Sequence, residues 1–260
     1  MLQSDKMIEE ALDMCWYTCH YQPKVEPSLN HIVGVEVLFR LDIPEIGIIP
    51  PNKFIQRAFE LGHEERIFFI VLEQALRDIK YLPDHLSLAI NITEAVISNP
   101  DNASRIFELL KNYRFSPSRL VLELSEHDGI SQDLSSYVDI YQSSNIKISI
   151  DDFGIGYSNI NKIINLNIDE LKFDKSLINN SRKTVALLLK SILNFCQEVG
   201  IKTVAEGVED AKTRALVERL GFDSYQGFYY SRPVSIQELG ATIATFLTHQ
   251  ESDEYELGTY

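Results

Sequence analysis

The feature that most constrains the fold of this chain is the alternation of short apolar, β-branched runs with helical stretches. The runs that we expect to form strands are 31–41, 86–92, 120–126, 146–151, 169–174, 201–206 and 222–227. Between them lie amphipathic helical patterns, and one of these places on a single face Val185, Leu188, Leu189, Ile192, Leu193 and Cys196. Strands that alternate with helices form βα units around a parallel sheet.

The number of these units favours a closed barrel over an open sheet. About seven units in roughly 230 residues fit a (β/α) barrel, and no glycine-rich loop follows the first strand as a dinucleotide-binding sheet would require. The segment 16–27 also predicts a strand, and its connection to the next run is too short for a crossover helix. The first two strands are therefore predicted to be antiparallel. We expect a helical lead-in at 1–16, the barrel at 17–248 and an acidic tail at 249–260.

Polar side chains lie in or after the carboxyl end of each predicted strand. They are Glu36, Asn91, Glu123, Asp151, Asp152, Lys172, Glu206 and Gln226. Because barrel strands converge at their carboxyl ends, where catalytic residues of such barrels are found, these side chains are predicted to form one site. A lone carboxylate in a strand is usually a surface residue, but five carboxylates together with an amide and a lysine are hard to explain in that way.

The adjacent carboxylates Asp151 and Asp152 suggest what such a site would hold. Neighbouring carboxylates repel each other unless a cation lies between them, although aspartate and glycine are also ordinary turn residues. The five carboxylates carry five negative charges, which two divalent cations and Lys172 would balance. Oxygen ligands without histidine favour Mg²⁺ or Mn²⁺ over Zn²⁺, and two bridged ions are suited to in-line attack of hydroxide on phosphorus.

The composition of the chain limits the classes of molecule that it can be expected to bind. The formal net charge of −14 argues against binding to a DNA or RNA polymer or to an anionic membrane, but not against a small phosphate substrate. No apolar run is long enough to insert into a membrane, and the start of the chain lacks the pattern of a signal peptide. The three cysteines form no even disulfide framework, and Cys15 and Cys19 with His20 lack a second pair at zinc spacing. These features predict a cytoplasmic protein.

Eight ordered motifs carry a resemblance to a known family. They are "YQPKV", "EVLFR", "AINIT", "LELSE", "DDFGIGYSN", "DELKFDKS", "AEGVED" and "YQGFYYSRP". The chain resembles, over residues 17 to 240, the bacterial EAL domain of cyclic di-GMP phosphodiesterases. The literal letters "EAL" at Glu10–Leu12 lie before the first predicted strand, and the matching motif is "EVL" at 36–38. The resemblance implies a (β/α)₈ TIM-like barrel with an antiparallel first strand, and hydrolysis of cyclic di-GMP to linear pGpG.

The resemblance also implies a role for each matching residue. One metal ion would be held by Glu36, Asn91, Glu123 and Asp151, and the second by Asp151, Asp152 and Glu206. Lys172 resembles the lysine that orients the attacking water, and the supporting shell behind Glu206 would consist of Glu209 and Gln226. The substrate would contact Gln22 through a guanine and Arg40 through a phosphate. The loop after the aspartate pair would be anchored by Glu126, Gly156 and Ser158.

Three interpretations of this pattern remain. An active phosphodiesterase needs every metal ligand, and all the matching positions are present. A catalytically weak receptor that binds cyclic di-GMP and regulates a protein partner would typically lack some ligands, and a pure interaction domain would also lose Gln22 and Arg40. The chain departs from the family pattern at Ile155, where a threonine is usual, which puts the rate of catalysis in question. Dimerisation is common in the family.

Overall fold

The protein is described by a computed structural model over residues 4–26, 31–80, 82–126, 134–154 and 160–257, with side chains described except at 160–162 and 247–257. The strands in this part are β1 (Tyr17–Glu26), β2 (His31–Ile43), β3 (Gly47–Ile49), β4 (Ser87–Asn91), β5 (Leu120–Ser125), β6 (Lys147–Phe153), β7 (Glu170–Phe173), β8 (Lys202–Ala205) and β9 (Ser224–Tyr225). The α-helices are α1 (Asp5–Asp13), α2 (Ile55–Glu60), α3 (Glu64–Ile79), α4 (Glu94–Ile97), α5 (Pro100–Asn112), α6 (Leu134–Ser143), α7 (Ile160–Asn165), α8 (Lys175–Ile178), α9 (Lys183–Val199), α10 (Ala211–Leu220) and α11 (Ile236–Leu257). Two short 3₁₀ helices are η1 (Pro51–Lys53) and η2 (Pro117–Arg119).

Eight strands close into a barrel in the order β1-β9-β8-β7-β6-β5-β4-β2, and β2 returns to pair with β1. β1 is antiparallel to both of its neighbours, whereas the remaining pairings around the barrel are parallel. β3 lies outside the ring as a hairpin partner of β2. The predicted (β/α)₈ barrel with an antiparallel first strand is confirmed.

The parallel strands point their carboxyl ends to one rim of the barrel. β1 runs the other way, so its register places Gln22 opposite Glu36 and Lys24 opposite Gly34. Residues separated by two positions on a strand face the same side, so the inward face of each strand carries a ladder of side chains from the amino-terminal end to this rim. The predicted strand-end residues therefore meet at one place.

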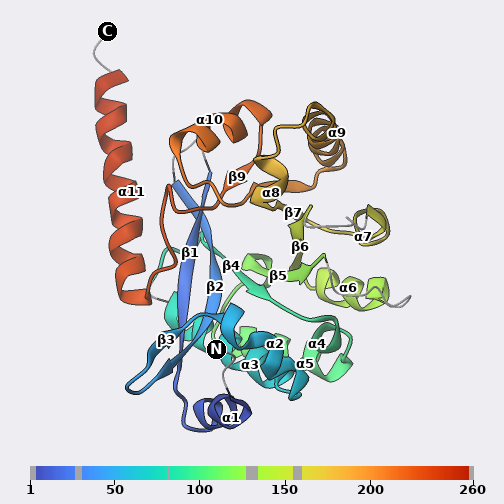
Figure 1. Cartoon of the computed structure of the whole chain (residues 1–260), viewed down its shortest axis with the longest axis vertical. Helices are drawn as coiled ribbons and strands as arrows, with labels where there is room; N and C mark the ends of the chain where they lie inside the picture. The colour runs from blue at the N-terminus through green and yellow to red at the C-terminus, as the bar shows by residue number, and fades with distance from the viewer. Residues whose placement is uncertain (1–3, 27–30, 81, 127–133, 155–159, 258–260) are drawn as a thin grey trace.

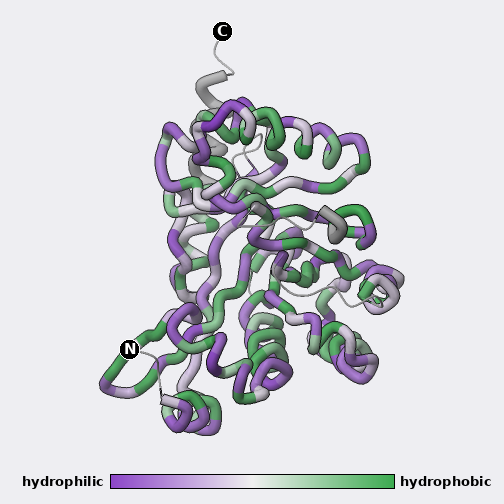
Figure 2. Tube along the Cα trace, turned by 45° about the vertical axis from the view of Figure 1, so that its right-hand side comes forward, coloured by the Kyte–Doolittle hydropathy of each residue, from purple (hydrophilic) through white to green (hydrophobic). Residues whose placement is uncertain are grey.

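Helices and loops cover the outside of the barrel, as Figure 1 shows. In Figure 2 these helices carry alternating hydrophilic and hydrophobic stretches, which is the pattern of elements with one buried side. The helical pattern of α9 was predicted to bury Leu188, but this side chain is 53% exposed. The buried stripe is instead formed by Leu189, Ile192, Leu193 and Cys196, at helical spacing, and Leu188 lies one step of about 100° away from Leu189.

The two ends of the chain are helical in the described part. α1 packs into the core through Ile8, Ala11 and Leu12, which are at most 1% exposed, and the letters "EAL" lie in this helix. α11 passes residue 248, where the barrel was expected to give way to a tail, and it runs along β1 and β2 in Figure 1. The boundaries at 16 and 248 stay a proposal. Within the described residues, no helix is both long and apolar enough to cross a membrane.

Candidate metal centre

A single buried lysine lies at the middle of the carboxylate cluster. Lys172 of β7 is 1% exposed, and its Nζ lies 2.9 Å from Glu206, 3.0 Å from Asp151, 3.2 Å from Glu123 and 3.4 Å from Glu36. The four carboxylates come from β2, β5, β6 and the residue directly after β8. Side chains that are far apart in the sequence are thus brought together by barrel closure.

The carboxylates fall into two groups that share Asp151. One group contains Glu36, Glu123 and Asp151, the other contains Asp151, Asp152 and Glu206, and in each group the ligand atoms lie within 4.8 Å of one another. These are the acidic members of the two ligand sets that the sequence predicts. A shared carboxylate between two oxygen-rich groups is an arrangement that can bridge two hard cations.

Burial and the neighbouring charges shift the pKa values of the groups in this cluster in opposite directions. Burial raises the pKa of Glu206 to about 8 and raises the pKa of Glu123 well above its ordinary value, although Lys172 opposes both shifts. Burial would lower the pKa of Lys172, but Asp151, Glu123 and the other two carboxylates raise it well above its usual range. The lysine is therefore charged at neutral pH, and it only partly offsets the repulsion among the acids.

Glu123 shows that the cluster is suited to a cation. Its side chain is 1% exposed, and neither carboxylate oxygen has a hydrogen-bond donor within the described part of the chain. A buried carboxylate without donors costs free energy, and the ion pair of Oε1 with Lys172 leaves Oε2 without a partner of its own. Metal coordination would satisfy it, so the residues present fit a divalent cation.

Amide side chains orient Glu36 from both sides. Asn91, which is exposed at the end of β4, donates to Glu36 Oε1 at 3.2 Å, and Gln226 donates to Oε2. Gln226 also donates to Gln22 Oε1 at 3.2 Å, and Gln22 donates in turn to the carbonyl of Ser231 at 3.4 Å. This chain of amides fixes Gln22 beside the cluster.

The backbone turns sharply directly after Asp151. Asp152 has a φ of 61°, in the left-handed region, and its N–H donates to Asp151 Oδ1 at 2.8 Å. Buried Glu126 accepts from the N–H of Gly154 at 3.0 Å, and its own N–H donates to the carbonyl of Asp151. Glu126 thus anchors the start of this loop, as the sequence suggests. The predicted anchors Gly156 and Ser158, and also Ile155, lie outside the described residues.

Two predicted residues, Glu209 and Arg40, make polar contacts outside the carboxylate cluster. Glu209 is exposed and forms an ion pair of 2.9 Å with Lys175, so it lies beyond Glu206 at the rim. Arg40 is half-buried and donates to the carbonyl of Phe39 at 3.0 Å. Burial lowers the pKa of Arg40, and the nearby Glu36 carboxylate opposes that shift.

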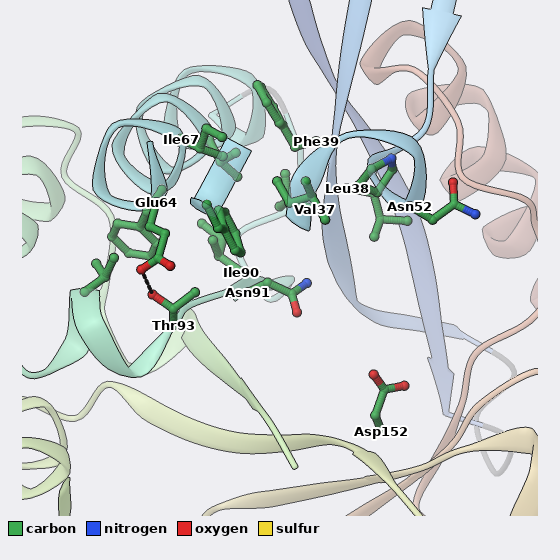
Figure 3. A pocket seen from close by; sticks show the side chains of 16 residues that line it. Val37, Leu38, Phe39, Asn52, Glu64, Ile67, Ile90, Asn91, Thr93 and Asp152 are labelled. Carbon is green, nitrogen blue, oxygen red and sulfur yellow. Dashed lines mark hydrogen bonds between the residues drawn. The ribbon is translucent and has the colours of Figure 1, made fainter. Parts of the chain in front are cut away.

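A cavity of about 400 Å³ opens beside the cluster between the barrel and helices α2 and α3. Its walls are mostly apolar, and its polar lining includes Asn52, Asn91 and Asp152. Figure 3 shows the side chains of Asn91 and Asp152 directed toward the same space, with Thr93 donating to Glu64 at 3.1 Å behind them. Asn52 was not predicted as a site residue, because it follows two prolines at the start of a helical pattern.

Comparison with known proteins places this geometry in a family. The family model of the EAL domain matches residues 5–233. MucR of Pseudomonas aeruginosa, a bifunctional diguanylate cyclase/cyclic di-GMP phosphodiesterase, is 31% identical over 91% of this chain and 36% of its own length. RocR of the same organism, a cyclic di-GMP phosphodiesterase, is 27% identical over 88% of this chain and 60% of its own length. The chain thus spans less than two thirds of each of these relatives.

Solved structures show the same fold. The MucR phosphodiesterase in complex with c-di-GMP superposes with a TM-score of 0.82 at 29% identity, covering 89% of this chain and 97% of that one. An EAL domain protein from Listeria monocytogenes gives a TM-score of 0.85 at 28% identity, over 94% of this chain and 99% of that one. Both similarities extend over the whole barrel.

Proposed function

The chain belongs to the EAL domain family of cyclic di-GMP phosphodiesterases, and on that premise we propose that it hydrolyses cyclic di-GMP to linear pGpG with two divalent cations, Mg²⁺ or Mn²⁺. The observation that carries the proposal is the pair of carboxylate groups that share Asp151 around Lys172. When bound, the cations would generate the nucleophile from water and neutralise charge on the phosphodiester oxygens.

Each of the two cations would be held by its own group of ligands, and the two groups share Asp151. Glu36, Glu123 and Asp151, with the amide oxygen of Asn91, would hold one cation. Asp151, Asp152 and Glu206 would hold the other. Asn91 donates to Glu36 through its amide nitrogen, which leaves its oxygen free to turn toward the cluster.

Lys172 would act during the reaction itself. Its ammonium carries three donors and is within reach of Asp151 and Glu206 at 3.0 and 2.9 Å. With the carboxylates engaged by cations, the ammonium of Lys172 would be free to donate hydrogen bonds to the attacking water and to the phosphoryl oxygens on which negative charge develops. Charge that develops only in the transition state is stabilised selectively by such a donor, so Lys172 should contribute to kcat.

The remaining residues would hold the dinucleotide across the rim. Arg40 offers a forked donor to a phosphate, and Gln22, fixed by Gln226, offers an amide to a guanine edge. We place one base in the apolar cavity, because its walls suit a planar ring and its lining includes Asn91 and Asp152 of the proposed ligand sets. Glu209, held at the rim by its ion pair with Lys175, would support Glu206 from outside the cluster.

One incubation tests the proposal. Purified protein is mixed with cyclic di-GMP and Mn²⁺, and the products are separated by chromatography, with an excess of chelator as the matched control. Formation of pGpG only in the metal-containing sample is the expected result. Binding of cyclic di-GMP without any turnover would instead assign the chain to the receptors that regulate a protein partner.

We also propose that the chain forms a homodimer through α9. Leu187, Leu188, Phe195 and Val199 are 42–59% exposed on the outward side of this helix, an apolar strip that a second copy would cover. Light scattering on the protein and on a Leu188→Glu/Phe195→Glu variant is the test. A monomeric variant and a dimeric parent are expected, and a monomeric parent would contradict the proposal.

A further inference from the structure

A second buried ion pair lies inside the barrel, and the proposed reaction does not use it. Lys24 of β1 contacts both carboxylate oxygens of Glu170 of β7, at 2.6 and 2.8 Å. Lys24 is 4% exposed and the Glu170 side chain 13% exposed. Lys24 and Lys172 are the two buried cations among the residues that the structure describes. A charge buried in this way requires a partner, and Glu170 provides it.

The pair lies one layer below the metal centre. Glu170 precedes Lys172 by two positions on β7, and Lys24 follows Gln22 by two positions on β1, which runs in the opposite direction. Both side chains therefore face the barrel interior, about 7 Å closer to its amino-terminal end along their strands than Lys172 and Gln22. β1 and β7 are separated by β8 and β9, so the ion pair spans the interior.

The layer around the pair is built from small residues. Gly34 lies opposite Lys24 in the register, and Ser149 lies between Glu123 and Glu170 in the pairing of β5, β6 and β7. A Cβ on Gly34 would come within 2.0 Å of Ser87 Oγ, so a larger residue does not fit there. Small neighbours leave the interior of this layer to the two long charged side chains.

The pair lies next to the residues of the proposed metal centre. Lys24 is two positions from Gln22, Glu170 is two positions from Lys172, and Glu170 pairs with Ser149, whose other neighbour in the ladder is Glu123. A charge on Lys24 therefore acts on the proposed ligands. The negative charge of Glu170 offsets that influence, because the ion pair as a whole is neutral. Loss of either partner would leave one full charge, of opposite sign in the two cases, beneath the cluster.

We propose that Glu170 is a positioning residue for the metal centre, which holds Lys24 across the barrel and cancels its charge so that the carboxylates above bind divalent cations at full strength. This inference rests on the proposed metal-dependent function. It predicts that the two partners have opposite effects on metal affinity. Glu170→Gln leaves an uncompensated positive charge and should weaken binding of Mn²⁺, whereas Lys24→Met leaves a negative charge and should strengthen it.

The experiment is a double-mutant cycle on Mn²⁺ affinity, measured by electron paramagnetic resonance without substrate. Each single variant should shift the dissociation constant by about tenfold or more, in opposite directions, since one charge acts on a divalent ion at short range inside the protein. The double variant should return close to the parent. Lys202→Met is the matched control, because the Lys202–Asp223 pair of 2.7 Å lies at the same end of the barrel but is exposed. It should leave the affinity unchanged.

Activity provides a second measurement. Turnover of Glu170→Gln should fall below that of the parent at limiting Mn²⁺ and approach it as the Mn²⁺ concentration is raised, because the lost charge acts through cation binding. Should Lys24→Met fail to fold, the comparison of Glu170→Gln with the double variant carries the test, and the single variant should bind Mn²⁺ more weakly than both the parent and the double variant.

Two outcomes would overturn the inference while the proposed function stands. They are a shift of both single variants in the same direction, as lost packing would produce, and unchanged affinity in both. A parent that binds Mn²⁺ and shows opposite shifts, but forms no pGpG, would refute the hydrolysis and support the inference. A parent that binds no Mn²⁺ at all would overturn both.

Discussion

Replacement of Lys172 by methionine separates the two roles that we propose for this residue, neutralisation of the carboxylates and stabilisation of the transition state. Methionine keeps most of the volume and removes the charge that lies 2.9–3.4 Å from four carboxylates. In the metal-free protein these carboxylates would then repel one another without compensation. Removal of one partner from a buried ion pair destabilises a protein by about 3–5 kcal/mol, which corresponds to a decrease of roughly 6–20 °C in the melting temperature at this size.

Added cations should reverse this loss of stability. Mn²⁺ takes over the neutralisation of the carboxylates, so the melting temperature of Lys172→Met should rise more on addition of Mn²⁺ than that of the parent. Turnover should not recover, because the donor to the transition state is gone, and a decrease of about 10²-fold or more in kcat is expected. Affinity for cyclic di-GMP should change little.

The assay is thermal unfolding of the two proteins in chelator and in Mn²⁺, together with steady-state kinetics. The same decrease in melting temperature under both conditions would refute the idea that the lysine charge and the cations neutralise the same carboxylates. An unchanged kcat with a raised KM would make Lys172 a phosphate anchor instead.

Four further predictions concern the proposed metal centre and the layer of side chains below it. Glu36→Ala should abolish pGpG formation while circular dichroism stays that of the parent, and wild-type turnover would remove Glu36 from the ligand set. Activity should appear with Mg²⁺ or Mn²⁺ and fail with Ca²⁺, whose longer bonds and higher ligand number would misplace the nucleophile; full turnover in Ca²⁺ alone would contradict this. Because burial raises the pKa of Glu206 to about 8, protons compete with the metal up to that pH, so Mn²⁺ affinity should rise between pH 6 and pH 8, and a flat profile by calorimetry would count against Glu206 as a ligand. Gly34→Ala would bring a Cβ to 2.0 Å from Ser87 Oγ and should lower the free energy of unfolding by about 1–3 kcal/mol, which urea titration measures, whereas an unchanged value would mean that the layer yields freely.

The barrel could be predicted from the sequence because its strands are separated by clear helical patterns. The antiparallel start was also predictable, since no helix fits between Glu26 and His31, where β1 ends and β2 begins. The buried face of α9 was harder to predict from the sequence. The run Leu187, Leu188 and Leu189 fits more than one choice of buried face. Only packing against the barrel decides that Leu189 is buried.

The proposed metal ligands could be singled out from the sequence because each is a polar residue inside an apolar strand or directly after one. The Lys24–Glu170 pair was not, because each residue alone is compatible with an exposed position on an alternating strand, and β1 and β7 meet only across the closed barrel. The cavity beside Asn91 likewise depends on how α2 and α3 lie over the barrel, which the periodicity of a helix does not determine.

The order in which the strands of the barrel are synthesised determines when the site can be completed. β1 leaves the ribosome well before its second neighbour, β9 (Ser224–Tyr225), and the two strands are joined through the single register pair of Val25 with Tyr225. Until that late segment emerges, one edge of the nascent sheet stays unpaired, and contacts of such long sequence separation form slowly. Glu36 is made long before Glu206, so the constellation around Lys172 is completed only once the segment that carries Glu206 has been made. A chain that stalls before residue 224 would therefore present an open, aggregation-prone edge and an unfinished binding site, which makes the nascent form the state most in need of a chaperone.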